Sequence, residues 1–300
     1  MPNYKTHSIH GEVIFPDMSK EIEIDIEDLK SFCIGPDALI TTDYKTFDRQ
    51  HEDKVREYFE SMLKIVKKNK LQDNAEAMAF IYGQLDHYIL DMTIHPLIYY
   101  ITEGMDSKHI FNPHGLIENW IDDYIIQKYD KEHLSYYHKL FLSNKKLKKA
   151  INKLYEKVYG SKNESFKYSL GILNTHLYDI LIRRNLIGIS PLLIKLFNVG
   201  NIMYDDDLER ILPYLNLDKD NWQDPETGEK YDDSFDELWI KSIERSLETV
   251  DDINNYLYKD EPLRNKYITN DISFNTGIPC GEGQSFQYIK QYNTNTHNTK

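Results

Sequence analysis

The chain has 300 residues, of which 49 are acidic and 36 are basic, so its net charge is −13. This length suits one large domain or two modest ones with an ample core. An acidic surface repels nucleic-acid backbones and anionic membranes unless a local basic patch or bound cations intervene. We therefore expect no nucleic-acid partner.

Cysteine content and hydropathy narrow the class of protein further. Cys33 and Cys280 are far apart and form neither a disulfide framework nor a CxxC zinc motif. The first residues lack the charged and apolar regions of a secretory signal, and no stretch reaches the roughly 18 apolar residues of a membrane span. We expect a soluble cytoplasmic protein without a transmembrane segment.

Apolar residues recur at helical spacing through much of the chain, whereas alternating strand patterns are scarce. The pattern predicts helices over 51–69, from Asn74 through Asp91, and over 114–129. Pro96 either kinks the second of these helices or ends and restarts it. Further helices are expected over 131–142, 144–159, 164–185, 189–198 and 234–257. The sequence therefore predicts an all-α fold, a multi-helix bundle.

We expect three parts along the chain. Residues 1–142 would form a metal-binding helical core, and residues 143–290 a C-terminal helical extension packed on the same domain. The tail 291–300 is polar low-complexity sequence and is expected to be disordered.

The apolar stretch GQLDHYILDMTIHPLIYY (83–100) carries His87, Asp91 and His95 at a spacing of four. Residues four apart on a helix share a face, with Cβ atoms about 6 Å apart. His87 and Asp91 can therefore bind one metal ion, and His95 is offset enough to serve a neighbouring ion. An unpaired buried polar group is unfavourable, and 75–102 contains no Lys or Arg to neutralise a carboxylate. The stripe favours metal binding over a buried ion pair.

The next predicted helix repeats this arrangement, with His114 and Glu118 four residues apart. A solvated helix pair is the alternative for these two. Asp37 follows a Gly-Pro turn, His51 opens a predicted helix, and His7 lies one turn into the N-terminal segment. Imidazoles mixed with carboxylates suit zinc best, with iron and manganese as alternatives.

A single histidine on an apolar helix face is usually a core residue bonded to a carbonyl group. We interpret five histidines in this way: His10, His109, His133, His138 and His176.

Several of these segments together resemble the zinc-dependent phospholipase C family, which shares its fold with single-strand-specific zinc nucleases. The main segments are THSIHG (6–11), GPD (35–37), His51, GQLDHYILDMTIHP (83–96) and HGLIE (114–118). NWQDPETG (221–228) and SFDEL (234–238) add a weaker likeness. The family pattern is a His near the N-terminus, then an Asp and a second His with thirteen residues between them, an H-x3-D helix, another His and an H-x3-E helix.

Carried over residue by residue, this resemblance implies two or three zinc ions, arranged as follows. The first ion would be held by Asp37, His51, His87 and Asp91, and the second by His95, His114 and Glu118. The third would be held by His7, a bridging Asp91 and the N-terminal amine. The secreted members use an N-terminal Trp here, whereas this chain begins Met-Pro. His95 also follows Asp91 more closely than in those enzymes.

The resemblance implies hydrolysis of a phosphodiester by in-line attack of an activated water. Closely spaced zinc ions lower the pKa of water towards ~7 and hold the attacking and leaving oxygens. Asp37 would orient or deprotonate that water while the ions stabilise charge on the phosphoryl oxygens. We expect a phosphoester or phospholipid-like substrate, although the sequence offers no basic membrane patch.

Two other classes of function remain open. The same metal pairs can be structural in a non-catalytic protein whose C-terminal extension binds a partner; a structural zinc is usually closed by four protein ligands, whereas a catalytic zinc keeps a water. A redox-active iron site would favour Glu-x-x-His pairs. The pairs here are His-x3-Asp and His-x3-Glu.

Overall fold

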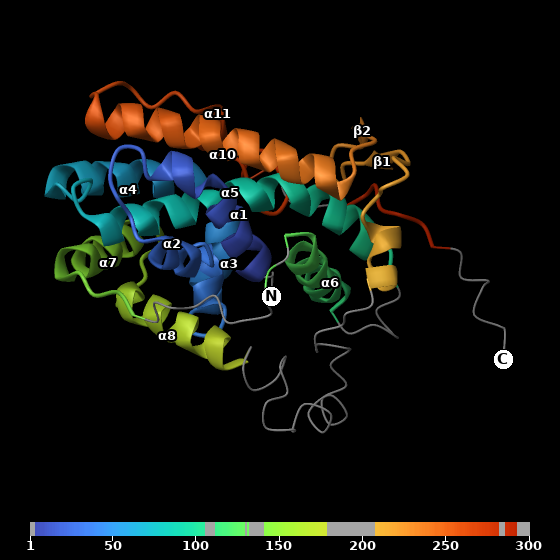
Figure 1. Cartoon of the computed structure of the whole chain (residues 1–300), viewed down its shortest axis with the longest axis horizontal. Helices are drawn as coiled ribbons and strands as arrows, with labels where there is room; N and C mark the ends of the chain where they lie inside the picture. Colours follow the sequence, from blue (N-terminus) through green and yellow to red (C-terminus); the bar gives the residue numbers. More distant parts are fainter. Residues whose placement is uncertain are drawn as a thin grey trace.

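The computed structural model describes residues 4–105, 112–129, 131, 141–178, 208–281 and 286–292, and their regular structure is almost entirely helical (Figure 1). The all-α prediction is confirmed. In chain order the elements are α1 (Tyr4–Met18), α2 (Ile26–Phe32), the 3-10 helix η1 (Gly35–Leu39), α3 (Tyr44–Glu52), α4 (Val55–Asn69), α5 (Ala75–Thr102), α6 (Pro113–Lys128), α7 (Lys145–Tyr159), α8 (Glu164–Tyr178), η3 (Leu208–Arg210), η4 (Leu212–Tyr214), β1 (Trp222–Gln223), β2 (Lys230–Tyr231), α10 (Phe235–Tyr258) and α11 (Lys266–Thr269).

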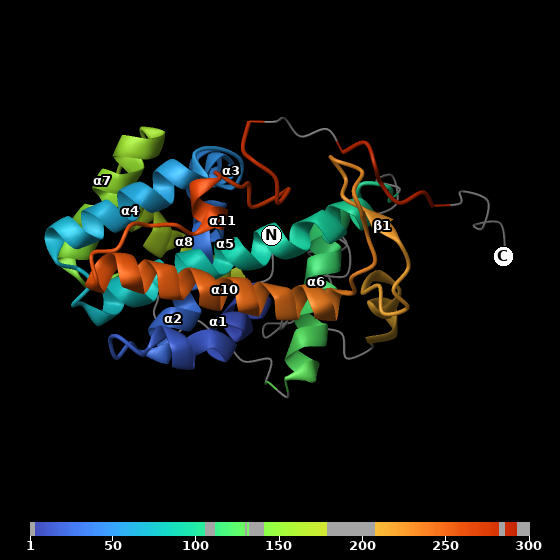
Figure 2. The same cartoon turned by 90° about the horizontal axis from the view of Figure 1, so that it is seen from above.

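Helix α5 is the central element of the fold. It begins where the sequence predicts, because the Asn74 side chain accepts a hydrogen bond from the Ala77 amide and caps the first turn. Nearly every residue of α5 is buried, as expected for a helix that is apolar on all sides. Helix α10 lies along it in both views (Figures 1 and 2), and α1, α2 and α6 also pack against it.

The buried apolar residues form two clusters that meet along α5. One contains Phe80, Leu85 and Ile89 together with residues of α2, α4, α7 and α8. The other contains Ile94 and Ile98 together with residues of α6 and the start of α10. The polar residues that the sequence singles out on α5 therefore lie in the interval between two apolar cores.

The prediction of a helix over 51–69 is wrong about where the helix begins. His51 does not open a helix but lies in the last turn of α3, which begins at Tyr44; the side chain of the preceding Asp43 caps the Thr46 amide. Lys54 then takes a left-handed backbone conformation, φ +61°, which stops α3 before α4 starts at Val55. The break places His51 and the apolar residues of α4 on two separate helices.

Pro96 does not interrupt α5, which runs through it to Thr102. Because proline has no amide hydrogen, the Met92 carbonyl loses its helical donor. The backbone of Gly277 packs on that carbonyl: a Cβ atom added there would lie 2.8 Å from the Met92 oxygen.

Helices α1 and α2 are absent from the sequence-based prediction. Residues 4–11 of α1 are all buried, so they show no alternation of apolar and polar faces that could mark a helix. The structure places α6, α7 and α10 close to their predicted ranges, and α8 ends its described part at Tyr178. The predicted helices 131–142 and 189–198, and the end of 164–185, lie mostly or wholly outside the described residues, as do residues 293–300 of the predicted tail.

Beyond residue 143, helices α7, α8 and α10 pack on the preceding helices, while the expected division near residue 142 stays a prediction. NWQDPETG forms β1, a turn capped by the Asp224 carboxylate, and the approach to β2. Ser234 and Glu237 form a capping box that starts α10. Among the described helices, none combines the length and apolar character needed to span a bilayer.

Candidate metal centre

Three polar residues at the middle of the site follow one another along α5, each about one helical turn after the last. His87, Asp91 and His95 are all buried, and the Asp91 carboxylate lies between the two imidazoles. Its Oδ2 is 2.9 Å from His87 Nε2, and its Oδ1 is 3.6 Å from His95 Nε2. The i, i+4 spacing in the sequence thus places all three on one face of the helix.

The turn η1 and the end of α3 add a second carboxylate and imidazole. Asp37 Oδ1 lies 3.3 Å from His51 Nε2 and 3.8 Å from His87 Nε2, and both Asp37 and His51 are buried. Gly35, at φ +57°, brings the η1 backbone onto the His87 ring, where an added Cβ atom would lie 2.3 Å from Cγ. The GPD motif therefore needs glycine because His87 occupies the space of a side chain.

Helix α1 contributes His7. Its Nε2 lies 3.2 Å from Asp91 Oδ1, and its ring stacks on that of His87 with centroids 4.0 Å apart. The adjacent Thr6 donates from its amide and from its hydroxyl to Asp122 Oδ1 on α6, both at 2.8 Å. These bonds hold the first turn of α1 against the helix that carries Glu118.

Helix α6 completes the site. The side chains of its i, i+4 pair are in contact, with His114 Nε2 3.0 Å from Glu118 Oε1. The same Glu118 oxygen lies 3.2 Å from His95 Nε2. Glu118 is buried, whereas the His114 side chain is 23% exposed. His114 thus marks a side of the centre that solvent can reach.

Three groups of ligand atoms result, and each could hold a metal ion: His7, His87 and Asp91; Asp37, His51 and His87; and His95, His114 and Glu118. The structure therefore brings all eight predicted site residues together. The grouping differs in one respect from that implied by the resemblance, because His87 lies within reach of both His7 and Asp37.

Backbone carbonyl groups set the orientation of three imidazoles. Each of the three donates a hydrogen bond from Nδ1. His51 donates to the Phe47 carbonyl at 2.9 Å and His87 to the Cys33 carbonyl at 3.0 Å. His95 donates to the Phe274 carbonyl at 3.1 Å. A carbonyl oxygen can only accept, so Nδ1 carries the hydrogen, and a ring in its neutral form presents a lone pair at Nε2. In metal sites such outer hydrogen bonds are the rule for histidine ligands.

The atoms that face the centre lack hydrogen-bond partners among the described residues. They include Nε2 of His51 and His87, Oδ1 of Asp37, Oδ2 of Asp91 and Oε2 of Glu118. Lone pairs of nitrogen and oxygen thus face one another in a buried space, which is unfavourable unless a cation lies between them. This donor set fits zinc, which prefers imidazole and carboxylate ligands.

The pKa shifts at the centre reflect the attraction between its buried carboxylates and imidazoles. Burial disfavours the Asp91 carboxylate, but the charges of His87, His95 and His7 outweigh it and hold the pKa of Asp91 well below its usual range. Burial likewise opposes protonation of His95, yet Asp91 and Glu118 raise the pKa of that imidazole to about 9. The Asp91 carboxylate therefore stays ionised, and positive charge is favoured beside it.

Of the histidines interpreted as core residues, His10 is confirmed as buried, although its partners are a carboxylate and a hydroxyl group rather than a carbonyl group. It is fully buried, and its two ring nitrogens lie 2.6 Å from Asp86 Oδ1 and 2.8 Å from Ser242 Oγ, which joins α1, α5 and α10. His176 belongs to none of the three groups, while His109, His133 and His138 lie outside the described residues.

Sequence analysis missed the residues that orient the ligands. Phe274 supplies its carbonyl to His95 from 179 positions away, and Asp122 acts on His7 through Thr6. A carbonyl group leaves no mark in the residue type, so no sequence signal identifies Phe274. Asp122 follows Glu118 by four residues on α6, and that spacing is a signal that could have suggested a role at the site.

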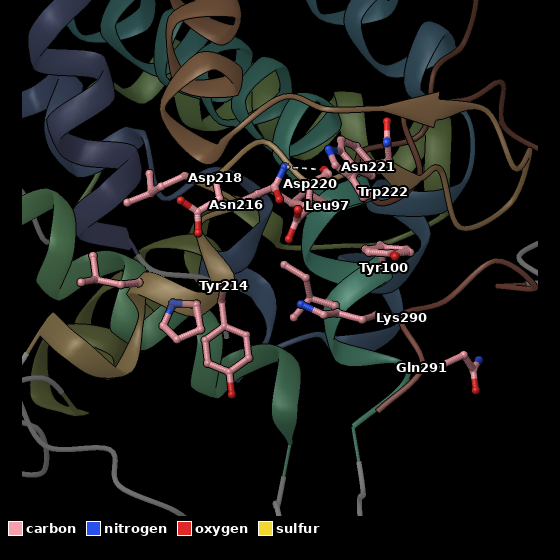
Figure 3. A pocket seen from close by; sticks show the side chains of 14 residues that line it. Leu97, Tyr100, Tyr214, Asn216, Asp218, Asp220, Asn221, Trp222, Lys290 and Gln291 are labelled. Carbon is pink, nitrogen blue, oxygen red and sulfur yellow. Dashed lines mark hydrogen bonds between the residues drawn. The ribbon is translucent and has the colours of Figure 1, made fainter. Parts of the chain in front are cut away.

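A larger hollow lies away from the metal centre. A pocket of about 830 Å³ opens between the end of α5, η4 and the residues before β1, and Figure 3 shows Tyr100, Trp222 and Lys290 among the side chains around it. It contains none of the eight predicted site residues. Beside His7 and Glu118 there is a hollow of about 30 Å³. The candidate site is therefore identified by its metal-binding side chains and not by the volume of a pocket.

Comparison with known proteins identifies the family of the chain. The family model for zinc-dependent phospholipase C matches residues 6–165, which is more than half of the chain and includes all eight residues of the centre. The match also extends past residue 142 through α7, whereas residues 221–238 lie outside it. No curated protein and no solved structure matches the chain. With this family match and three groups of side chains that could each hold a metal ion, the protein is a metal-dependent hydrolase that belongs to the zinc-dependent phospholipase C family.

Proposed function

We propose that the protein hydrolyses phosphodiesters of the phospholipid type with a multinuclear zinc centre built from the eight residues described above. The observation that carries the proposal is the position of Asp91, a single buried carboxylate that faces four imidazoles. Its Oδ1 faces His7 and His95, and its Oδ2 faces His87 and, at 3.9 Å, His51. A carboxylate with imidazole groups near both of its oxygens is suited to bridge two metal ions that lie close together.

The residues divide into holding and reacting roles. His7, His51, His87, His95, His114, Asp91 and Glu118 would hold the ions. Bound zinc would supply Lewis acidity, lowering the pKa of water towards ~7 and stabilising negative charge on phosphoryl oxygens. Asp37 would orient the attacking water and accept its proton, since Asp37 Oδ1 faces the centre without a hydrogen-bond partner among the described residues.

The competing function is a non-catalytic protein with structural metal sites. Two features favour catalysis. The group of His95, His114 and Glu118 supplies three ligands, which leaves a coordination position for water or substrate in a tetrahedral zinc site. His114 is partly exposed, so this position is reached from solvent.

The test combines metal analysis with a phosphodiesterase assay on the purified full chain. We expect two or three zinc ions per chain, matching the three groups, together with hydrolysis of a short-chain phospholipid that stops on chelation and returns with zinc. Chelation should also lower the melting temperature, because it leaves buried lone pairs facing one another. One tightly held ion, or several ions without hydrolysis of any phosphodiester, would favour the structural alternative.

Substitutions link the metal to the activity. His87→Ala should remove hydrolysis and bound zinc together, because His87 belongs to two of the three groups. The matched control is His176→Ala, which removes a histidine outside those groups and should change neither quantity. If His87→Ala kept full zinc content and activity, the proposed centre would be wrong.

A further inference from the structure

Helix α7 is strongly basic although the protein as a whole is acidic. It carries Lys145, Lys146, Lys148, Lys149, Lys153 and Lys157, and Glu156 is its single acidic residue. Leu147, Ile151 and Leu154 form the buried face of the helix. The lysines consequently gather on its solvent side, in a chain whose net charge is −13.

Within the described part of the fold, only one of these lysines is hydrogen-bonded to another side chain. Lys157 donates to Ser61 Oγ, but the other five make no side-chain hydrogen bond or ion pair with any described residue. Lysines on neighbouring helices behave differently, since Lys64 pairs with Glu60 and Lys167 pairs with Asp43. The positive charge of α7 is therefore available to an outside partner.

An apolar stripe adjoins this basic face on α8. Phe166, Leu170, Leu173 and Leu177 recur at helical spacing on the side of α8 away from the core; Phe166 is 67% exposed and Leu177 is 43% exposed. Phe141, just before α7, is 54% exposed. Such large apolar side chains side by side on a surface usually mark an interaction site.

Two hydrogen bonds place the stripe next to the lysines. The Ser165 amide at the start of α8 donates to Asn152 Oδ1 on α7, and the Leu142 amide before α7 donates to Ser169 Oγ on α8. The two helices accordingly lie side by side along one end of the molecule (Figure 1). We call the lysines of α7 together with Phe141 and the α8 stripe the basic-apolar surface.

We propose that the basic-apolar surface docks the protein on an anionic phospholipid bilayer. Lysines are attracted to anionic lipid headgroups, and exposed Phe and Leu side chains insert at the boundary between headgroups and acyl chains. A single-stranded nucleic acid fits less well, because three of the four stripe residues are leucines, which offer no ring for bases to stack on. This local patch reverses the expectation, drawn from net charge, that the surface repels anionic membranes.

The basic-apolar surface is linked to one of the helices that build the metal centre. The C-terminal end of α7 is bonded to α3 beside His51: Arg49 Nη1 donates to the Tyr159 carbonyl at 3.1 Å. The identity of the lipid as a substrate rests on the proposed function, but binding to the bilayer does not require hydrolysis. The two can therefore fail separately.

The experiment is co-sedimentation of the full zinc-loaded chain with vesicles. One set contains phosphatidylcholine alone, and the other contains equal parts of phosphatidylcholine and phosphatidylglycerol. Replacing Lys145, Lys149 and Lys153 by Gln should weaken binding to the anionic vesicles about 100-fold, since each lysine near such a surface is worth about five-fold. The matched control replaces Lys230, Lys259 and Lys266, which are also exposed, and changes the net charge equally.

A second pair of variants tests the apolar stripe. Phe166→Ser should weaken binding to the anionic vesicles about ten-fold, because one buried aromatic side chain is lost from the interface. Ile240→Ser, at a 55% exposed position on α10, should leave binding unchanged. Both substitutions are at exposed positions, so folding is expected to be retained and can be verified by thermal melting.

The outcomes separate the two proposals. Absence of binding to anionic vesicles, or equal loss with both lysine triples, would overturn the docking surface. Binding to single-stranded DNA without binding to vesicles would assign the surface to nucleic acid and would also overturn it. Hydrolysis of a water-soluble phosphodiester is measured in parallel. Its absence beside intact vesicle binding would refute the proposed activity and leave the docking surface standing.

Discussion

His87 and Asp91 lie one turn apart on α5 with Nε2 and Oδ2 separated by 2.9 Å, yet neither atom has a hydrogen-bond partner among the described residues. The reason is the tautomer: His87 donates from Nδ1 to the Cys33 carbonyl, so the neutral ring turns a lone pair towards the carboxylate. Two acceptors at this distance in a buried site are unfavourable unless a proton or a metal cation lies between them.

Asp91→Asn tests the shared carboxylate. Asn has nearly the same shape but no charge, so the four imidazoles around it lose their common anionic partner. We expect zinc affinity and phosphodiester hydrolysis to fall at least about 100-fold, because the loss of an outer-shell partner of a ligand alone costs roughly 10- to 100-fold. Equilibrium dialysis of zinc and initial rates check this. Unchanged zinc binding in a folded variant would show that Asp91 is not a ligand.

Gly35→Ala tests the approach of η1 to His87. The substitution combines an unfavourable positive φ with a Cβ atom 2.3 Å from the His87 ring. Gly160→Ala is the matched control, because Gly160 has φ +71° and no atom within 4 Å of the added Cβ. We expect the control to lower the free energy of unfolding by about 1–2 kcal/mol. Gly35→Ala should lower it further and should also weaken zinc binding.

Denaturant unfolding and zinc titration of both variants measure these effects. Equal destabilisation by the two substitutions, with normal zinc binding in each, would mean that the contact between Gly35 and His87 is not needed to place the ring.

Asp122→Ala tests the bonds that hold the first turn of α1. It removes the acceptor of the amide and the hydroxyl of Thr6 and leaves a buried amide without a partner, at about 1–3 kcal/mol. We expect weaker binding of the ion held by His7, whereas the ion at His95, His114 and Glu118 should be retained. Isothermal titration with zinc would then show one weakened class of sites.

Thr6→Val removes only the hydroxyl bond and should produce a smaller change in the same direction. A uniform loss of all zinc sites in Asp122→Ala would contradict a selective role for α1.

Asp43→Asn tests a pH-dependent contact away from the metal centre. Burial acts against the carboxylate, but hydrogen bonds from Lys167 and Ser161 outweigh it, and the pKa of Asp43 lies below its usual value of 3.8. A lowered pKa contributes stability above the unfolded pKa, and that contribution is lost as the pH falls through the folded pKa. The wild type should therefore exceed Asp43→Asn in stability at neutral pH, with the difference shrinking below about pH 4.

Asn at position 43 still offers an oxygen to the Thr46 amide, so the cap of α3 is preserved and the comparison isolates the charge. Melting temperatures of both proteins between neutral and acidic pH measure the effect. A difference that stays constant with pH would rule out the ion pair as its source.

Much of the site was predictable because helix geometry is local. The pairs of His87 with Asp91 and of His114 with Glu118 each lie on one helix, where a spacing of four places side chains on one face whatever the rest of the chain does. The same holds for the start of α5 at Asn74, since a side-chain cap acts within three residues.

Only the tertiary structure decided which of these groups meet. The approach of His7 to Asp91 depends on how α1 packs, and the Phe274 carbonyl reaches His95 across most of the chain. His51 faces Asp37 because α3 ends at Glu52, and this break arises from the backbone of Lys54, which no apolar periodicity reports. Contacts between helices depend on packing of the whole core. Sequence spacing therefore determined the paired ligands within each helix, and packing determined the centre that they form together.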